Sequence, residues 1–348
     1  MSNEQSGLLW QSITEALAHF PIALFSSVMG IIGLGLAWRA AAPVFALSSF
    51  VGEAIVAVSV FVYAAILICY GLKMACHPAA VKHEFLHPES VNFFPTFSIG
   101  TMLLASGVMP YAPQLAHMFW SVGAVITLVL TLVIVGRWLT HQNDVKHVNP
   151  TWFLAVVGNI VAPIAAVPLG HDELGWMFFG IGILFWIPLF TIVLYRMIFH
   201  GLLPSRLLPT MMILVGPPAV GFIAYVGLVG EIDGFARVLL YGAGFITLLI
   251  ASIARAFVGI RFSASWWAFT FPLDAFTLAI LHYYEQSGEQ ALGIAAAIAL
   301  IVSSVVVLIV SACTVGALVR GTLLKPNTQR LTDGKPGDNG AGDETRLL

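Results

Sequence analysis

Residues 265–275 read SWWAFTFPLDA and lie inside an apolar run that extends from about 263 to 284. Such a run is long enough for a helix to cross the hydrocarbon core of a bilayer. Pro272, near its middle, removes one backbone N–H and leaves the carbonyl of Ala268 without its helical donor. Lipid tolerates such a break only where the helix is buried or lines a polar cavity. The stretch therefore predicts a broken helix at a pore, with the ring of Phe271 and the carboxyl of Asp274 beside the break.

The composition of the whole chain is that of a membrane protein. Its 348 residues are 59% hydrophobic and only 9% charged, whereas ordinary soluble domains carry about 25% charged residues. The formal net charge is −2, which excludes the strongly basic surface that nucleic-acid binding requires. We therefore expect a multipass protein whose main partner is the lipid bilayer, with no nucleic-acid partner.

The hydropathy pattern predicts ten membrane-spanning helices and no strands. They belong to one transmembrane domain over residues 17–321, between a cytoplasmic N-terminal segment, 1–16, and a tail, 322–348, that is too polar to bury a core and is expected to be disordered. The ten apolar runs cover residues 17–38, 50–72, 93–112, 114–136, 150–169, 174–198, 206–228, 235–257, 263–284 and 290–319.

The basic residues predict the orientation of these helices. Arg39 and Arg237 alone fall on one side of the predicted membrane. The positive-inside rule places the other side, and with it both termini, in the cytoplasm. That side holds Lys73, Lys82, Arg137, Lys146, Arg196, Arg206, Arg255, Arg261, Arg320, Lys325, Arg330, Lys335 and Arg346.

Proline recurs in every odd-numbered run, whereas among the even-numbered runs only the sixth contains one near its centre, Pro188. We interpret this alternation as five helical hairpins, each with one kinked and one straighter helix. Kinked helices expose backbone groups that need water or protein partners. The simplest arrangement is an inner ring of five kinked helices around a central pore, with the straighter helices facing lipid.

Several short motifs, taken together, resemble one known family. The chain is similar to the TehA tellurite-resistance/dicarboxylate transporter and plant slow anion channel family over all ten predicted helices. The motifs that carry the resemblance are FPIALF at 20–25, HPAAV at 77–81, NFFP at 92–95, VGN at 157–159, LGHDELG at 169–175, PPAV at 217–220 and WWAFTFP at 266–272.

This resemblance implies a ten-helix barrel with quasi-fivefold symmetry and one pore per protomer, assembled as a homotrimer in the bacterial inner membrane. Phe271 matches the family's gating aromatic, and Phe25 a pore aromatic on the first helix. The substrates implied are small inorganic anions such as chloride, nitrate and sulfite, or dicarboxylates such as malate. Tellurite resistance names a phenotype and leaves the substrate open.

No Lys or Arg lies in the middle of an odd-numbered run, so another group must attract an anion. The amides at the start of each half-helix beyond a kink form a partially positive end that can do so. The amide of Asn159 is either a further anion ligand or a hydrogen-bonding link between helices. The residues we predict to line the pore are Phe20, Phe25, Phe94, Asn159, Pro163, Gly216, Pro217 and Pro272.

Asp274 departs from the small residue expected next to the gate, and an ionised carboxylate in the pore would oppose anions. An intramembrane acid is a candidate for proton or ion coupling. It equally fits a hydrogen-bonded carboxyl between helices. The alternative function is therefore a proton-coupled dicarboxylate or sulfite permease.

Other classes of protein have weaker support from the sequence. His83 and His87 lie four residues apart in a predicted cytoplasmic loop, a spacing with which a helix can offer two zinc ligands. A membrane enzyme built on this loop, or a sensor with a permanently closed pore, are the alternatives. The chain has no phosphate-binding glycine loop and no paired acids in its apolar runs. We therefore predict a protein that is not an enzyme, with no cofactor and no metal site.

Overall fold

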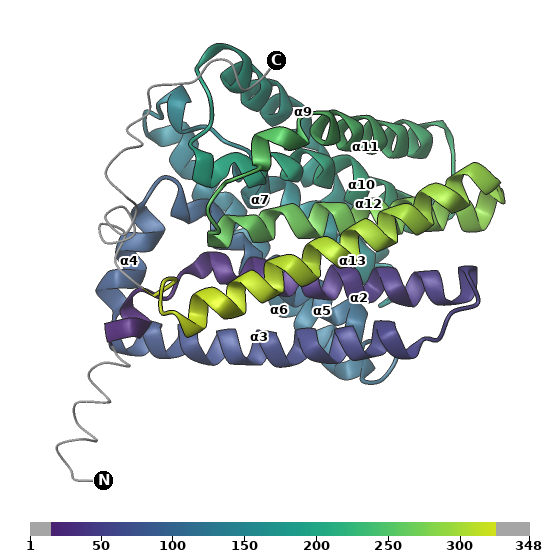
Figure 1. Ribbon diagram of the computed structural model, residues 1–348, viewed down its shortest axis with the longest axis horizontal. Helices are drawn as coiled ribbons and strands as arrows, with labels where there is room; N and C mark the ends of the chain where they lie inside the picture. The colour runs from purple at the N-terminus through teal and green to yellow at the C-terminus, as the bar shows by residue number, and fades with distance from the viewer. Residues whose placement is uncertain (1–14, 325–348) are drawn as a thin grey trace, which may run out of the picture.

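The computed structural model describes residues 15–324, in which helices are joined by short turns and loops and there is no strand. The prediction of an all-α protein is confirmed for this part of the chain. The segment 1–16 and the tail 322–348 lie almost entirely outside the described residues. Figure 1 shows long helices that run roughly side by side along the longest axis of the molecule.

Five elements share one construction, in which a 3-10 turn leads into an α-helix. In four of the five elements the 3-10 turn comes first in the chain, and in the third element it lies in the middle, between α7 and α8. The elements are η1 (Ile22–Leu24) with α2 (Phe25–Val44), η2 (Ser90–Phe93) with α5 (Pro95–Val108), α7 (Trp152–Val156) with η4 (Val157–Val161) and α8 (Ala162–Ala166), η5 (Ser205–Val215) with α10 (Gly216–Val229), and η7 (Ala264–Phe269) with α12 (Thr270–Ser287).

Each of these inner elements is followed by a long uninterrupted helix. In the four inner elements of spanning length, 67–78% of the residues are buried, against 28–39% in the long helices that follow. The long helices therefore form the outside of the molecule. They are α3 (Phe50–Cys76), α6 (Pro113–Thr140), α9 (Asp172–Phe199), α11 (Gly234–Ser252) and α13 (Gln290–Val319).

The contacts between helices close the inner elements into a ring. Going round it, α2 packs on α5, α5 on α8, α8 on α10, α10 on α12, and α12 on α2 again. Each inner element also packs on the outer helix that follows it in the chain. The short helix α4 (Pro78–Leu86) connects α3 to η2 at one end of the bundle (Figure 1).

Nine helices in the described residues have the length and apolar composition to cross a membrane. They match nine of the ten predicted runs. The exception is the predicted run 150–169, which forms the shorter apolar element Trp152–Ala166. Within this element α7, η4 and α8 follow one another with two changes of helix type.

Proline marks the start of the inner α-helices and does not kink them in the middle. Pro95, Pro163 and Pro217 each occupy the first or second position of their α-helix. Pro272 is the third residue of α12, directly after the 3-10 turn η7. Proline suits this place because its missing N–H would lack an intrahelical partner there anyway. Within the described residues Pro43 and Pro188, by contrast, lie inside continuous α-helices.

The outer helix α6 supplies hydrogen bonds to the irregular backbone between α7 and α8. The Thr131 hydroxyl donates to the carbonyl of Ala155 at 2.8 Å, and the Trp120 indole donates to the carbonyl of Ala162 at 3.0 Å. Irregular backbone at membrane depth persists only where protein groups satisfy it in this way.

The contact between α2 and α12 depends on glycine at position 30. A Cβ at Gly30 would lie 2.8 Å from the Cβ of Thr270, closer than real Cβ contacts come. We expect Gly30→Ala to destabilise the protein by about 1–3 kcal/mol, the usual cost of overpacking a core. Gly100→Ala is the matched control, because its nearest contact would be an ordinary 3.5 Å from Val28. Thermal unfolding in detergent measures both, and equal melting temperatures for the two variants would contradict the prediction.

Candidate functional site

Two cavities lie inside the ring of inner elements. The first, here called the apolar cavity, has a volume of about 50 Å³. All five inner elements contribute to its wall, and no charged side chain does. Its lining residues include Ser26, Met29, Ile99, Phe153, Leu154, Ile213, Pro217, Trp267 and Pro272.

The second cavity, here called the Arg39 cavity, is larger, at about 280 Å³. Its lining residues come from later positions in the same five elements, so it lies further along the ring axis. Arg39, Ser106 and His282 are the polar members of its wall. Among its apolar members are Leu36, Leu103, Ile164, Ile223 and Leu278.

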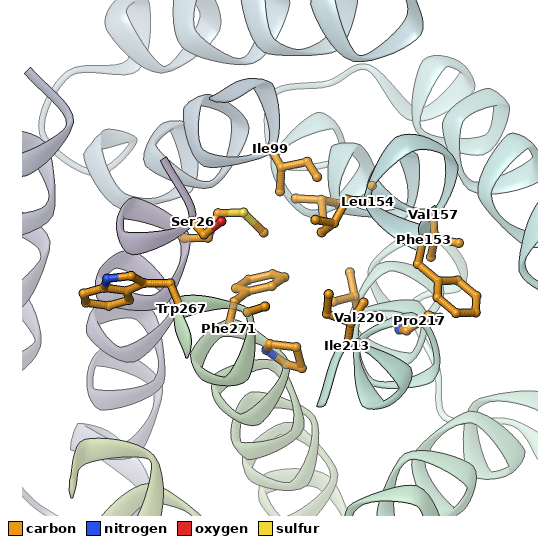
Figure 2. A pocket seen from close by; sticks show the side chains of 16 residues that line it. Ser26, Ile99, Phe153, Leu154, Val157, Ile213, Pro217, Val220, Trp267 and Phe271 are labelled. Atoms are coloured by element: carbon orange, nitrogen blue, oxygen red, sulfur yellow. The ribbon is translucent and has the colours of Figure 1, made fainter. Parts of the chain in front are cut away.

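Phe271 and Val220 line both cavities, and they are the residues common to both walls. The two side chains therefore lie between the cavities. Figure 2 shows the ring of Phe271 projecting into the middle of the apolar cavity, with Ile99 and Leu154 across from it. Phe271 retains 8% of its accessible surface, so other protein atoms surround the ring on nearly all sides.

The structure brings Phe271, Pro272, Gly216 and Pro217 together in the wall of the apolar cavity. The first turns of α10 and α12 supply these residues, since Gly216 begins one helix and Thr270 the other. Helix N-termini are partially positive, and the first turns of both helices contribute residues to the cavity wall.

Five residues predicted to line the pore lie in neither cavity wall: Phe20, Phe25, Phe94, Asn159 and Pro163. Phe25 instead packs its ring between the inner and outer helices. Its ring centroid lies 5.1 Å from that of Phe97, 5.9 Å from that of Tyr70 and 6.2 Å from that of Tyr63. The aromatic on the first helix is thus part of the packing between α2, α3 and α5.

Phe94 points the same way as Phe25, away from the axis. Its ring makes an edge contact with Phe85 of α4 at 4.9 Å. Pro163 lies toward α9, with its Cα 3.8 Å from the place where a Gly175 side chain would begin. Both residues pack an inner element against the segment outside it.

Asn159 forms hydrogen bonds within the irregular segment α7–η4 and to α6, and it does not line either cavity. Its side-chain amide donates to the Thr131 hydroxyl at 2.9 Å and to the carbonyl of Val156 at 2.6 Å. The residue is fully buried. Of the two roles the sequence left open, the contacts match the link between helices.

Phe20 takes part through its backbone in a buried ion-pair network at the α4 end of the bundle. The Lys73 ammonium donates to the carbonyl of Phe20 at 2.8 Å and to the Glu84 carboxylate at 2.6 Å. Glu84 also accepts hydrogen bonds from the amide of Ile22 and the hydroxyl of Tyr70. The Glu84 side chain, on α4, thereby holds the start of the first inner element in place.

Asp274 faces away from both cavities. The Ser303 hydroxyl of α13 donates to one of its carboxyl oxygens. The other oxygen lies against Gly33 of α2 and has no hydrogen-bond partner among the described residues. The carboxyl is fully buried where α2, α12 and α13 meet.

Arg39 and Glu53 form a two-pronged ion pair at the edge of the Arg39 cavity. The Arg39 Nε donates to Glu53 at 2.8 Å and the Nη2 at 2.7 Å. Tyr111 also hydrogen-bonds to Glu53, and this bond raises the pKa of the Tyr111 phenol. The pair joins the end of α2 to the beginning of α3.

His83 lies on α4, and His87 is the residue that follows its last turn. Among residues 15–324, no group of three His, Cys, Asp or Glu side chains is close enough to hold a metal ion. The structure brings no third ligand to this pair.

Sequence reasoning did not single out Val220, Glu53 or His282 as functional residues, and it used Arg39 only to predict orientation. Val220 ends the PPAV motif and lies one turn after the start of α10. Its place in that motif is the sequence feature from which it could have been predicted. Arg39 and Glu53 are charges at the ends of consecutive apolar runs, where solvation alone explains such residues. Their opposite charges, at the same predicted end of two consecutive helices, are the sequence feature that could have predicted the ion pair.

The sequence matches the family described as voltage-dependent anion channel over residues 19–315. It is 30% identical over 275 residues to the S-type anion channel SLAH3 of Arabidopsis thaliana, covering 77% of this chain and 43% of that protein. It is 29% identical over 280 residues to the guard cell S-type anion channel SLAC1 of the same plant, covering 77% and 50%.

A bacterial relative matches over more of its length. The Tellurite resistance protein TehA homolog of Haemophilus influenzae is 26% identical over 307 residues, which cover 86% of this chain and 92% of that protein. The chain spans about half the length of the plant relatives. The relatives are channels and a resistance protein, so the resemblance read from the motifs is confirmed. With the family match covering most of its length, this multipass membrane protein belongs to the voltage-dependent anion channel family, a family of channels and not of enzymes.

Proposed function

We propose that the chain forms a passive conduit for small inorganic anions, closed at the level of Phe271. The position of the Phe271 ring, between two cavities on one axis, is the observation that carries the proposal. A narrow apolar constriction excludes water, and an ion cannot pass where its hydration shell cannot. The ring therefore acts as the gate, with Val220 as its nearest counterpart on α10.

The wall of the apolar cavity supports selection by backbone dipoles. It contains no basic side chain, so nothing there binds an anion tightly. The first turns of α2, α10 and α12 reach it through Ser26, Gly216 and Phe271. Partially positive helix ends attract anions weakly, and weak binding is what conduction requires.

The proposed architecture is ten membrane crossings in residues 17–321, arranged as five hairpins with quasi-fivefold symmetry. The closed ring of inner elements supports it. The shorter element Trp152–Ala166 then provides the fifth crossing, within the ring and covered by α6 and α9. We place the protein in the bacterial inner membrane with both termini in the cytoplasm, since 13 of 15 basic residues fall on that side.

The assembly we propose is a homotrimer with one conduit in each protomer. Family resemblance is its support. Native mass spectrometry of the purified protein in detergent tests it, and a monomeric mass would contradict it.

Reconstitution of the Phe271→Ala variant into a planar bilayer tests the proposed function, because the variant lacks the ring that closes the conduit. With a potassium chloride gradient across the membrane, we expect the reversal potential to lie near that of chloride. Replacing chloride by nitrate should sustain the current, and replacing potassium by a large organic cation should not change it. A reversal potential near that of potassium would overturn the proposal.

Asp274 separates a passive conduit from the alternative proton-coupled permease for dicarboxylates or sulfite. Because its carboxyl bonds to Ser303 and lines neither cavity, we expect Asp274→Asn, introduced into the open Phe271→Ala variant, to leave anion flux within about twofold of that variant alone. Flux into liposomes of chloride and of malate, with and without a pH gradient, measures this. Uptake that is driven by the pH gradient and lost in Asp274→Asn would favour the permease instead.

A further inference from the structure

Arg39 has one N–H group that makes no hydrogen bond to any of the residues 15–324. A guanidinium has five N–H donors. Four of those of Arg39 are taken, two by Glu53, one by the carbonyl of Ser106 at 3.3 Å and one by the carbonyl of Gly107 at 3.0 Å. The remaining donor is on Nη1, and Arg39 lines the Arg39 cavity.

Glu53 lies behind the guanidinium and is absent from the cavity wall. The ion pair is therefore a dipole whose positive end borders the cavity and whose negative end faces away. Arg39 is the only side chain with a permanent charge in that wall. Its field on the cavity is positive but weaker than that of an unpaired cation.

Two further polar groups in the same wall lack protein partners. The Ser106 hydroxyl and the His282 Nδ1 are buried and have no hydrogen-bond partner among the described residues. Buried polar atoms usually have a partner, and an unpaired one points to a ligand or water in the molecule at work. Ser106 lies on α5 and His282 on α12, so these groups reach the cavity from different sides.

We infer that the Arg39 cavity holds a binding site for a single small monovalent anion, such as chloride or nitrate, held by Arg39 with Ser106 and His282. The two-pronged fork that a carboxylate would need is already occupied by Glu53. A single free N–H in a cavity of about 280 Å³ therefore favours a small hydrated anion over a dicarboxylate. The inference rests on the proposed function, because the site would bind an anion in the cavity next to the Phe271 gate.

Chloride binding to the full-length protein in detergent tests the site without any need for the gate to open. The broadening of the chloride-35 resonance measures exchange of chloride onto the protein. Relative to the unmodified chain, we expect Arg39→Gln to weaken the apparent chloride affinity about two- to fivefold, and Glu53→Gln to strengthen it by a similar factor. Nitrate should compete with chloride, and malate at equal concentration should not.

Arg237→Gln is the matched control. Arg237 lies near the start of α11 at the same end of the bundle, is exposed and lines neither cavity. Arg237→Gln removes one positive charge from the same side of the protein as Arg39→Gln. An equal loss of chloride affinity in the two variants would therefore show a general charge effect and overturn the site. Unchanged affinity in Glu53→Gln would also overturn it. This second variant keeps the test decisive if Arg39→Gln fails to fold.

Currents through Phe271→Ala provide an independent readout. In that background, Arg39→Gln should raise the half-saturating chloride concentration about two- to fivefold when chloride is varied on the Arg39 side only. If Arg39→Gln changes the chloride-35 broadening but Phe271→Ala passes no anion current, the proposed conduit is refuted and the binding site stands. Anion currents with no response to Arg39 or Glu53 would refute the site and keep the conduit.

Discussion

Phe271→Ala is expected to convert a closed conduit into a constitutive anion leak. The ring lies between the apolar cavity and the Arg39 cavity, so its removal joins the two into one water-accessible path. If the dewetted constriction raises the barrier to an anion by only about 1.4 kcal/mol, its loss increases conductance about tenfold. Single-channel recording and chloride efflux from liposomes both measure this change.

Phe269→Ala is the matched control for the gate. Phe269 lies two residues away and makes an edge contact with Phe257 at 5.6 Å. It lines neither cavity. Conductance that stays low in Phe271→Ala, while the variant unfolds at the temperature of the unmodified protein, would refute the gate. Equal leaks in both variants would point to loosened packing of η7 and α12 in place of an opened constriction.

Lys73→Met should cause the largest loss of stability. The Lys73 side chain is 4% exposed and the Glu84 side chain 14%. Without the ammonium, Glu84 would remain as a buried, uncompensated charge, and breaking a buried ion pair costs about 3–5 kcal/mol. The amide of Ile22 and the hydroxyl of Tyr70 would keep their bonds to Glu84, so α4 would remain attached to the bundle while the protein loses stability. Thermal unfolding in detergent measures it.

The double variant with Lys73→Met and Glu84→Gln should recover part of the lost stability, because it removes the charge left behind. Lys82→Met is the control, since Lys82 is exposed on α4 and surface substitutions usually change stability by less than about 0.5 kcal/mol. A melting temperature for Lys73→Met equal to that of Lys82→Met would show that the network contributes nothing measurable.

Much of the architecture follows from local features of the chain. The apolar runs predict the helices, because crossing a bilayer requires a minimum length of apolar residues whatever the fold. The prolines predict which elements are interrupted, because proline cannot donate to an α-helix wherever it occurs. Nine runs form long helices, and every interrupted inner element contains proline, although Pro188 lies in the uninterrupted outer helix α9. The exact form of the interruption, a 3-10 turn before an α-helix, depends on the packing around each proline.

Local sequence features did not predict whether a side chain of an inner helix points toward the ring axis or away from it. Phe25 and Phe271 are both aromatic residues at the start of an inner helix, yet one packs outward on Tyr63 and the other lies between the cavities. Most residues of an inner helix are buried on whichever face they lie, so hydrophobic periodicity does not indicate which face points to the ring axis.

Apolar run lengths, proline positions and the distribution of basic residues are properties of the chain itself, and they established a multipass bundle of broken and unbroken helices. The closure of the ring, the separation of two cavities by Phe271, and the pairing of Arg39 with Glu53 exist only once distant segments meet. The physical reason is that a cavity and an ion pair are relations between elements, set by how helices rotate and approach when they pack, and no single run of residues encodes that rotation.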